Sequence, residues 1–302
     1  MDVPFAYDHA EPLVFGGALP IRRSFDESAV VILPVPVDRT TSYVGGTQNG
    51  PHEILQASSH MELWDDEMRT DVHGIGIFTL PEMELPFGEM EPLLDEIERV
   101  ADEIIGRDKF LVSLGGEHSI TPPLVAAAAR KYPGMSVLQI DAHADMRDAY
   151  MGTRHNHACA MRRCLEHARL TQVGIRSLST EEAEVLPKLN TTVFYDASMR
   201  LDPAWMDAVI ESLAADVYIS IDVDGLDPAI MPATGSPEPG GLSWAEITTL
   251  LRTVAARRRI VSADVVELTP IPGMVAPSFL CAKLIYKLLT YRFASDPRAK
   301  KL

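Results

Sequence analysis

Two short motifs in the sequence place acidic and histidine side chains at alternate positions. Asp141, His143 and Asp145 follow the spacing i, i+2, i+4, and Asp222 and Asp224 repeat the spacing i, i+2. Residues at this spacing point to one face of an extended strand, so each motif directs its side chains toward one place. Converging carboxylates repel each other and are costly to bury unless cations neutralise them. The pattern therefore predicts bound metal ions.

The type and charge of these side chains indicate which metal ions would bind and what chemistry they would support. Two divalent cations would balance the four carboxylates, and His118 and His143 add neutral nitrogen ligands. Mixed oxygen and nitrogen ligands suit Mn²⁺, Fe²⁺ or Zn²⁺ better than Ca²⁺, and the lack of cysteine disfavours structural zinc. Two ions that share a water molecule lower its pKa and supply a nucleophile near neutral pH. A hydrogen-bonded turn is the alternative for residues 141–145 alone, but the other motifs favour a metal site.

Short apolar, β-branched runs alternate with helical patterns along the chain. This alternation is typical of an α/β fold with a parallel sheet, and we expect one domain over residues 1–302. The predicted strands are residues 30–34, 75–80, 110–114, 136–140, 172–175, 192–195, 217–221 and 261–267. The predicted helices are residues 91–105, 124–131, 180–189, 203–213, 244–256 and 278–289, two of them with Ser-x-x-Glu capping boxes at Ser179 and Ser243.

The predicted strands explain how the motifs could meet. The strands at 110–114, 136–140 and 217–221 each run directly into a polar cluster that contains the candidate ligands. Open α/β sheets bind their ligands at the carboxyl ends of the strands. We therefore expect His118 and both acidic motifs to lie at one edge of the sheet.

The composition limits the partners and the location. Acidic residues outnumber basic ones 43 to 27, for a net charge of −16, which argues against nucleic acid and favours cationic small molecules. The three cysteines form no C-x-x-C motif, which indicates reduced thiols, and we expect Cys159 and Cys164 to serve in packing. Residues 1–10 lack the apolar core of a signal peptide, and no apolar run reaches the roughly 18 residues of a membrane span. We expect a cytoplasmic protein that binds no membrane.

Three segments together resemble the signatures of the ureohydrolase family, which includes arginases and agmatinases. They are Gly-Gly-Glu-His-Ser (115–119), Asp-Ala-His-Ala-Asp (141–145) and Ser-Ile-Asp-Val-Asp-Gly-Leu-Asp-Pro (220–228), the last extended by residues 232–241. The resemblance covers residue 34 to the C-terminus. It implies a three-layer α/β/α fold with an eight-stranded, mostly parallel sheet, two Mn²⁺ ions per chain, and a homo-oligomer, either a trimer or a hexamer.

The resemblance also implies how the six ligands divide between two ions. One ion is held by His118, Asp141, Asp145 and Asp222, and the other by Asp141, His143, Asp222 and Asp224. Asp141 and Asp222 would bridge the pair. Zn²⁺ or Ni²⁺ could occupy the same ligand set, because affinity alone favours metals later in the series. Position 117 is glutamate here and aspartate in many relatives.

Four further residues are implied to act on the substrate. His157 matches a histidine of a mobile loop in the family, and histidine is suited to deliver a proton near neutral pH. Asn156 and Arg154, in the same segment, are expected to contact the substrate. Glu267, at the end of a predicted strand, matches the glutamate that pairs with the guanidinium group, which a carboxylate can grip with two parallel hydrogen bonds.

The sequence is most similar to agmatinases. Residues 174–179 read Gly-Ile-Arg-Ser-Leu-Ser, without the aspartate that binds the α-amine of arginine in arginases. We therefore expect hydrolysis of agmatine to putrescine and urea, a step of polyamine biosynthesis. The loop at residues 271–277 is expected to shape the rim of the pocket, and it lacks the Pro-Tyr-Asp-like stretch of many agmatinases.

The sequence alone is also compatible with other functions. Within the family, the substrate could be arginine, guanidine, formiminoglutamate or a guanidino acid such as guanidinobutyrate, the last read by Arg154. Outside it, a binuclear metallophosphoesterase would also use clusters of aspartate and histidine, although the negative charge and the lack of a phosphate clamp argue against it. An inactive binding relative is disfavoured because all six ligand positions are filled.

Overall fold

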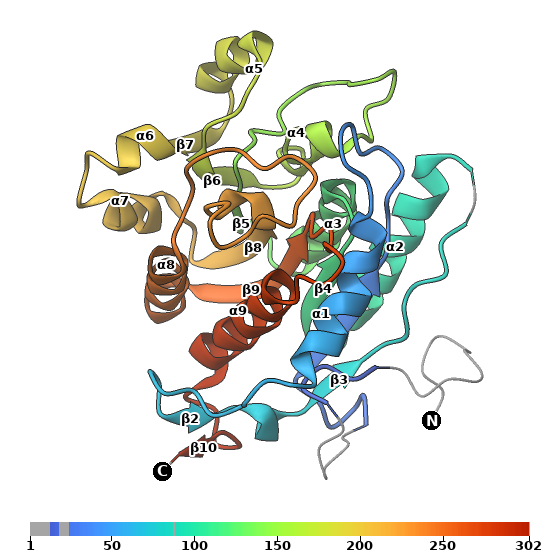
Figure 1. The fold of residues 1–302 in the computed structure, drawn as a ribbon, viewed down its shortest axis with the longest axis vertical. Coiled ribbons are helices and arrows are strands. Elements are labelled where there is room, and N and C mark those ends of the chain that lie inside the picture. Colours follow the sequence, from blue (N-terminus) through green and yellow to red (C-terminus); the bar gives the residue numbers. More distant parts are fainter. Residues whose placement is uncertain (1–12, 18–23, 87, 302) are drawn as a thin grey trace.

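An eight-stranded parallel sheet forms the centre of the computed structural model, which describes residues 13–17, 24–86 and 88–301 (Figure 1). Each neighbouring pair of strands in it is parallel. In spatial order the strands are β3 Ile77–Thr79, β1 Val30–Val35, β4 Phe110–Gly115, β9 Arg259–Val266, β8 Asp216–Asp222, β5 Ser136–Ile140, β6 Arg169–Ile175 and β7 Thr191–Tyr195. A separate antiparallel pair joins β2 (Thr70–Asp71) to β10 (Lys300–Lys301).

Apolar side chains cover both faces of the sheet, which makes the fold three-layered. In β1, Val30 and Ile32 belong to one buried cluster, and Val31 and Leu33 belong to the other. This alternation follows from the two-residue period of a strand, and strands buried on both faces need apolar residues at nearly every position. The expected three-layer α/β/α architecture is confirmed.

Helices supply the two outer layers. One face is covered by α1 Gly50–Ser58, α7 Trp205–Ser212, α8 Trp244–Arg257 and α9 Ala276–Phe293. The other is covered by α2 Met90–Gly106, α3 Thr121–Lys131 and α4 Ala160–Cys164. Two short helices, α5 Thr180–Val185 and α6 Asp196–Met199, flank β7 in the sequence. None of the helices in the described part of the chain is long and apolar enough to cross a membrane.

Most of the predicted elements are present, with some differences. All eight predicted strands occur, although only Ile77–Thr79 of the 75–80 run is extended. Both predicted capping boxes form, at Ser179 and at Ser243. Three helices, α1, α4 and α6, were not predicted; α1 begins at Gly50-Pro51, a pair that reads as a turn. Glu267 lies just beyond β9, in left-handed backbone with φ of 66°, and not in the strand as expected.

The strand order brings the chemical motifs together. β4, β9, β8 and β5 are consecutive in the sheet. Their carboxyl ends lead to His118, to Glu267, to Asp222 and Asp224, and to the 141–145 motif. Segments separated by more than 100 residues in the sequence therefore end at one edge.

Candidate metal centre and active site

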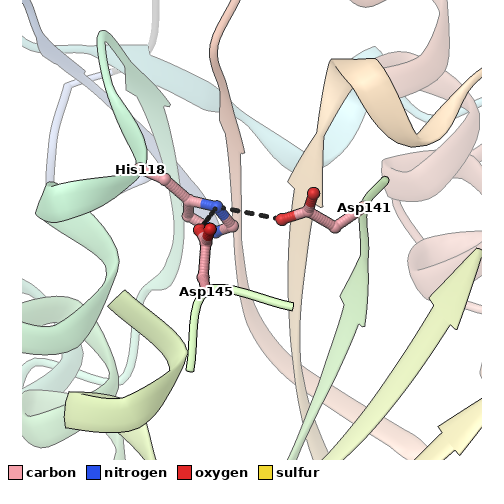
Figure 2. Close-up of side chains that lie close together, drawn as sticks. All are labelled: His118, Asp141 and Asp145. Atoms are coloured by element: carbon pink, nitrogen blue, oxygen red, sulfur yellow. Dashed lines mark ion pairs between the residues drawn. The ribbon is translucent and has the colours of Figure 1, made fainter. Parts of the chain in front are cut away.

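The imidazole of His118 lies among three buried carboxylates. Its Nδ1 atom is 3.0 Å from Asp145 Oδ2, 3.2 Å from Asp141 Oδ2 and 3.4 Å from Asp222 Oδ2. Figure 2 shows His118 facing Asp141 and Asp145 from the segment after β4. A nitrogen lone pair and carboxylate oxygens that converge in this way form one candidate metal-binding group, His118, Asp141 and Asp145.

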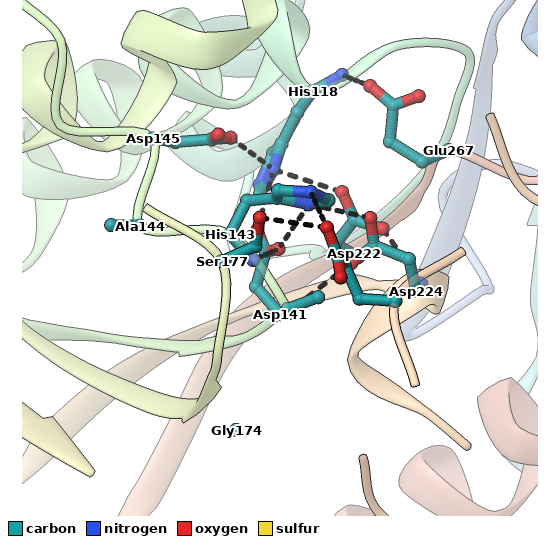
Figure 3. A network of polar contacts seen from close by, with 12 residues as sticks. His118, Asp141, His143, Ala144, Asp145, Gly174, Ser177, Asp222, Asp224 and Glu267 are labelled. Atoms are coloured by element: carbon teal, nitrogen blue, oxygen red, sulfur yellow. Dashed lines mark hydrogen bonds and ion pairs between the residues drawn. The ribbon is translucent and has the colours of Figure 1, made fainter. Parts of the chain in front are cut away.

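A second candidate group shares Asp141 with the first. It consists of Asp141, His143 and Asp224, with His143 Nδ1 2.9 Å from Asp224 Oδ2 and 3.7 Å from Asp141 Oδ1. Asp141 thus faces one histidine with each of its oxygens, as a bridging carboxylate would (Figure 3). Asp222 is part of neither group, although its Oδ2 atom lies 3.4 Å from His118 Nδ1. All six predicted ligands therefore lie together.

The electrostatics of the cluster are unfavourable without cations. Burial and the neighbouring Asp224 and Asp141 raise the pKa of Asp222 well above its usual range. Burial and Asp141 also raise the pKa of Asp145 and of Asp224. Burial opposes protonation of His143, yet Asp224 and Asp141 raise the pKa of its imidazole to about 12. Protons or metal ions must balance these carboxylates.

The residues present fit divalent metal ions. His118 Nδ1 is buried and faces three carboxylate oxygens without a hydrogen bond of normal geometry in the described residues, so a cation between these atoms would satisfy all of them. The donor set of carboxylate oxygens and imidazole nitrogens is typical of Mn²⁺, Fe²⁺ and Zn²⁺ sites. No thiol takes part: Cys159 and Cys164 are buried, and burial raises the pKa of both thiols. This agrees with their expected packing role.

Buried hydrogen bonds fix the orientation of His118. Its Nε2 lies 2.9 Å from Ser220 Oγ, which donates to Asp264 Oδ1 at 2.7 Å. The other oxygen of Asp264 accepts from the hydroxyls of Tyr218 and Thr121. Because Nε2 donates to Ser220, Nδ1 is left as the ligand atom, and such outer partners usually fix the tautomer of a metal-binding histidine.

Two of the candidate aspartate ligands are also held by hydrogen bonds from residues outside the cluster. Gln139 Nε2 donates to Asp141 Oδ2 at 2.6 Å, and Gln172 Nε2 donates to Gln139 Oε1 at 2.6 Å. The guanidinium of Arg176 donates to the carbonyl oxygen of Asp224 at 2.7 Å and to carbonyls of Gly174, Leu226, Glu238 and Pro239. Arg176 therefore supports the loop after β8.

Glu267 is held beside the metal-binding groups in an uncommon backbone conformation. Glu267 has a φ of 66° and Asp145 a φ of 52°, so both residues lie in the left-handed region. Left-handed non-glycine residues cost roughly 1–3 kcal/mol and cluster at functional sites. Glu267 Oε1 accepts from the backbone N–H of His118 at 2.7 Å, and burial and Glu117 raise the pKa of its carboxyl well above the usual range. An adjoining cation would restore its negative charge.

A cavity of about 280 Å³ opens onto these residues. Its lining includes His143, Asp145, Asp222, Asp224 and Glu267. His157 lines it as well, from the segment that follows the 141–145 motif in the sequence. The remaining wall is rich in hydroxyl groups: Thr41, Ser42, Tyr43, Tyr150, Ser177, Ser179 and Ser236.

Other predicted substrate residues lie outside the lining. The side chain of Asn156 accepts from Ala158 N and reaches the carbonyl of Thr40, so it braces the loop. Arg154 pairs with Glu166 at 3.2 Å on the surface. Neither residue lines the cavity, and their contacts with substrate stay predictions.

The rim of the cavity differs from expectation. The loop at residues 271–277 contributes no lining residue, contrary to the prediction that it shapes the rim. The segment that follows β1 does so instead, through Thr41, Ser42, Tyr43 and Val44. Arg147, for which the sequence predicts no role, also lines the cavity, with its guanidinium carbon 4.7 Å from the centre of the Tyr150 ring. In the sequence, Arg147 lies two residues after the 141–145 motif, whereas residues 41–44 are far from all three motifs.

Comparisons with known proteins show which family the chain resembles in sequence and fold. The sequence profile described as "Arginase family" matches residues 28–290. The chain is 38% identical to the N(1)-aminopropylagmatine ureohydrolase of Synechocystis sp. over 89% of its length and 90% of that protein. It is 34% identical to the agmatinase of Bacillus cereus, over 82% and 86% of the two chains. The crystal structure of agmatine ureohydrolase of Thermoplasma volcanium superposes with a TM-score of 0.83 at 32% identity, over 91% and 94% of the two chains.

The hydrogen bond from His118 to Ser220 yields a first prediction. Ser220→Ala removes the partner that fixes Nδ1 as the ligand atom, and we expect metal affinity to fall about 10- to 100-fold. Titration calorimetry on metal-stripped protein measures the change. Ser262→Ala is the matched control, because that buried hydroxyl donates to the carbonyl of Leu111, away from the site. Equal affinities in Ser220→Ala and the wild type would refute the role.

The shared position of Asp141 yields a second prediction. Asp141→Ala should reduce the binding of both ions, because this carboxylate belongs to both groups. Asp145→Ala should affect mainly the ion next to His118. Metal analysis after gel filtration distinguishes the two patterns. Two tightly bound ions in Asp141→Ala would show that Asp141 does not bridge.

Proposed function

The chain belongs to the arginase family and is an amidinohydrolase, and we propose that it hydrolyses agmatine to putrescine and urea. The observation that supports this most strongly is the position of Glu267. It is a buried carboxylate that lines the same cavity as four of the six candidate ligands, namely His143, Asp145, Asp222 and Asp224. That arrangement suits a small cation whose electrophilic carbon must lie next to the metal ions.

Glu267 is proposed to bind the guanidinium group. A planar, delocalised cation matches a carboxylate through two parallel hydrogen bonds. The raised pKa of Glu267 reflects burial without a paired cation, so a bound guanidinium would favour the ionised form. The buried ion pair would then hold the guanidinium carbon in place for attack.

Two Mn²⁺ ions are proposed as the cofactors, held by the six predicted ligands. When bound, they would activate a water molecule as the nucleophile. Asp141 is placed to bridge them, and Asp222 is proposed as the second bridge because its Oδ2 reaches the ligand atom of His118. The protein itself brings the carboxylates together and fixes the orientations of the imidazole rings.

His157 is proposed as the proton donor. Hydrolysis breaks the bond between the guanidinium carbon and the alkyl nitrogen, and the departing amine must gain a proton. Histidine performs this transfer near neutral pH. His157 lines the cavity, whereas His155 points toward Glu91, with 3.4 Å between His155 Nε2 and Glu91 Oε1.

The cavity wall supports a cationic alkylamine as the tail of the substrate. Hydroxyl groups dominate the wall away from the metal ligands and can accept hydrogen bonds from an ammonium group. Arg147 could attract the carboxylate of a guanidino acid, but Glu182 at 3.8 Å and the ring of Tyr150 already interact with its charge.

N(1)-aminopropylagmatine is a second candidate substrate, favoured by the names of relatives from Synechocystis and Thermus thermophilus. A homo-oligomer and a cytoplasmic location stay predictions.

Urea release by the Mn²⁺-loaded protein tests the proposal. The panel comprises agmatine, N(1)-aminopropylagmatine, arginine, guanidinobutyrate, guanidine and formiminoglutamate, with a phosphoester as the control from another class. We expect agmatine to have the highest kcat/KM and arginine to be poor. Preference for the aminopropyl compound would change the substrate and keep the chemistry, whereas phosphoester hydrolysis alone would overturn the function.

Glu267→Gln keeps the shape of the side chain and removes its charge. A buried guanidinium then loses its partner, which typically costs about 2–5 kcal/mol, or roughly 30-fold to several-thousand-fold in kcat/KM. Metal content should stay the same. Glu211→Gln, which removes an exposed carboxylate that pairs with Arg257, is the control. Unaltered kcat/KM in Glu267→Gln would remove this residue from the mechanism.

His157→Ala should lower kcat by about 10²- to 10⁴-fold, the usual contribution of a general acid. Both metal ions should remain bound, because His157 is not a ligand. His155→Ala serves as the comparison and should lose far less activity. Steady-state kinetics with metal analysis decides the matter, and full activity in both variants would show that neither histidine carries the proton.

A further inference from the structure

The hydroxyl group of Thr40 joins the segment that follows β1 to two residues much later in the sequence, Glu117 and His157. Thr40 lies in the segment that follows β1, and its Oγ1 is 2.7 Å from Glu117 Oε1. The same oxygen is 2.9 Å from the backbone nitrogen of His157 and 3.2 Å from the Nδ1 atom of its ring. One hydroxyl thus lies between a buried carboxylate and the proposed proton donor.

Glu117 is surrounded by hydrogen-bond donors. Its Oε2 accepts from the backbone N–H groups of Arg39 at 2.7 Å and of Thr40 at 2.6 Å. Its Oε1 accepts from the hydroxyls of Thr40 and Ser119, at 2.7 and 2.5 Å. The side chain is fully buried. Two donors on each oxygen satisfy an ionised carboxylate, which can only accept.

This arrangement fixes where the Thr40 proton points. A hydroxyl has one proton and two lone pairs. The proton is donated to Glu117, so both lone pairs face His157, where one accepts from the backbone N–H. The other can accept only a proton on the ring nitrogen Nδ1, 3.2 Å away. Neutral His157 must therefore carry its proton on Nδ1.

We propose that Glu117 and Thr40 position His157, by holding its ring in the Nδ1–H tautomer with Nε2 turned to the cavity. Nε2 is then the atom that accepts a proton and delivers it to the leaving amine. Nε2 is 3.5 Å from Ser42 Oγ, a long hydrogen bond, and both residues line the cavity. This inference rests on the proposed role of His157 in hydrolysis. Glu117 and Thr40 themselves do not touch the reacting atoms.

The hydroxyl is not needed to hold the segment after β1. The backbone N–H groups of Arg39 and Thr40 already bind Glu117, and Asp38 accepts from Thr41 Oγ1 and Gly46 N. Valine has nearly the same shape as threonine. Thr40→Val therefore removes the hydrogen bonds that this hydroxyl makes with Glu117 and His157 while these other bonds remain, and Thr40→Ser restores the hydroxyl.

Kinetics of these variants gives the first arm of the test. In Thr40→Val we expect kcat to fall about 10- to 100-fold, as when an orienting partner of a histidine is lost, with little change in KM. Thr40→Ser should recover most of the loss. Thr153→Val is the matched control: it removes a hydroxyl that accepts from the backbone N–H of His155 in the same loop, and it should retain activity.

A double mutant separates positioning of the ring from support of the loop. In His157→Ala the backbone N–H of residue 157 can still bind Thr40, but the ring is gone. If Thr40 acts through the ring, adding Thr40→Val to His157→Ala causes no further loss. A further loss equal to that seen in the wild-type background would mean that Thr40 acts through the backbone, and would overturn the proposal.

The tautomer of His157 can be measured without any substrate. In Zn²⁺-loaded protein labelled with ¹⁵N-histidine, the ring signals of His157 are assigned by their loss in His157→Asn. We expect a protonated Nδ1 and an unprotonated Nε2 in the wild type and in Thr40→Ser, and a mixture of tautomers in Thr40→Val. A wild-type ring protonated on Nε2 would overturn the proposal. If no guanidino compound is hydrolysed, the proposed function fails, and this measurement still decides the positioning role.

Discussion

The need to neutralise four buried carboxylates is the constraint on which the rest of this structure depends. Asp141, Asp145, Asp222 and Asp224 are each nearly or fully buried at one edge of the sheet. Two histidines face them, and three of the four carboxyl groups have raised pKa values because of burial and mutual repulsion. Such a cluster is stable only when positive charge enters it, whether as protons, metal ions or a cationic substrate. The acidic surface, with a net charge of −16, would draw cations toward it.

The fold holds these charged side chains in fixed positions. Four neighbouring strands deliver the ligands and Glu267 to one edge. Partners outside the cluster then hold three of these residues: the Ser220–Asp264 pair holds His118, Gln139 holds Asp141, and Arg176 holds the backbone of Asp224. The same principle extends to the proposed proton donor through the segment after β1. Chemistry at a metal centre needs fixed donors, and these outer hydrogen bonds supply the fixation.

The sequence predicts the strands and the meeting of the acidic motifs at one edge of the sheet, for physical reasons. Apolar β-branched runs mark strands buried on both faces, and alternating acids at their ends mark ligands. It does not reveal contacts made by the folded chain alone. That β9 lies between β4 and β8, and that Glu267 adopts left-handed backbone, depend on tertiary packing. Thr40 and Glu117 carry no motif that points to His157, because the contact joins segments that only the fold brings together.

Metal dependence of urea release tests the central claim most directly. Metal-stripped protein is titrated with Mn²⁺ while urea release from agmatine is followed. The account predicts no activity in the stripped protein and activity that rises until two ions are bound per chain. Full urea release by the stripped protein in the presence of excess chelator would contradict it.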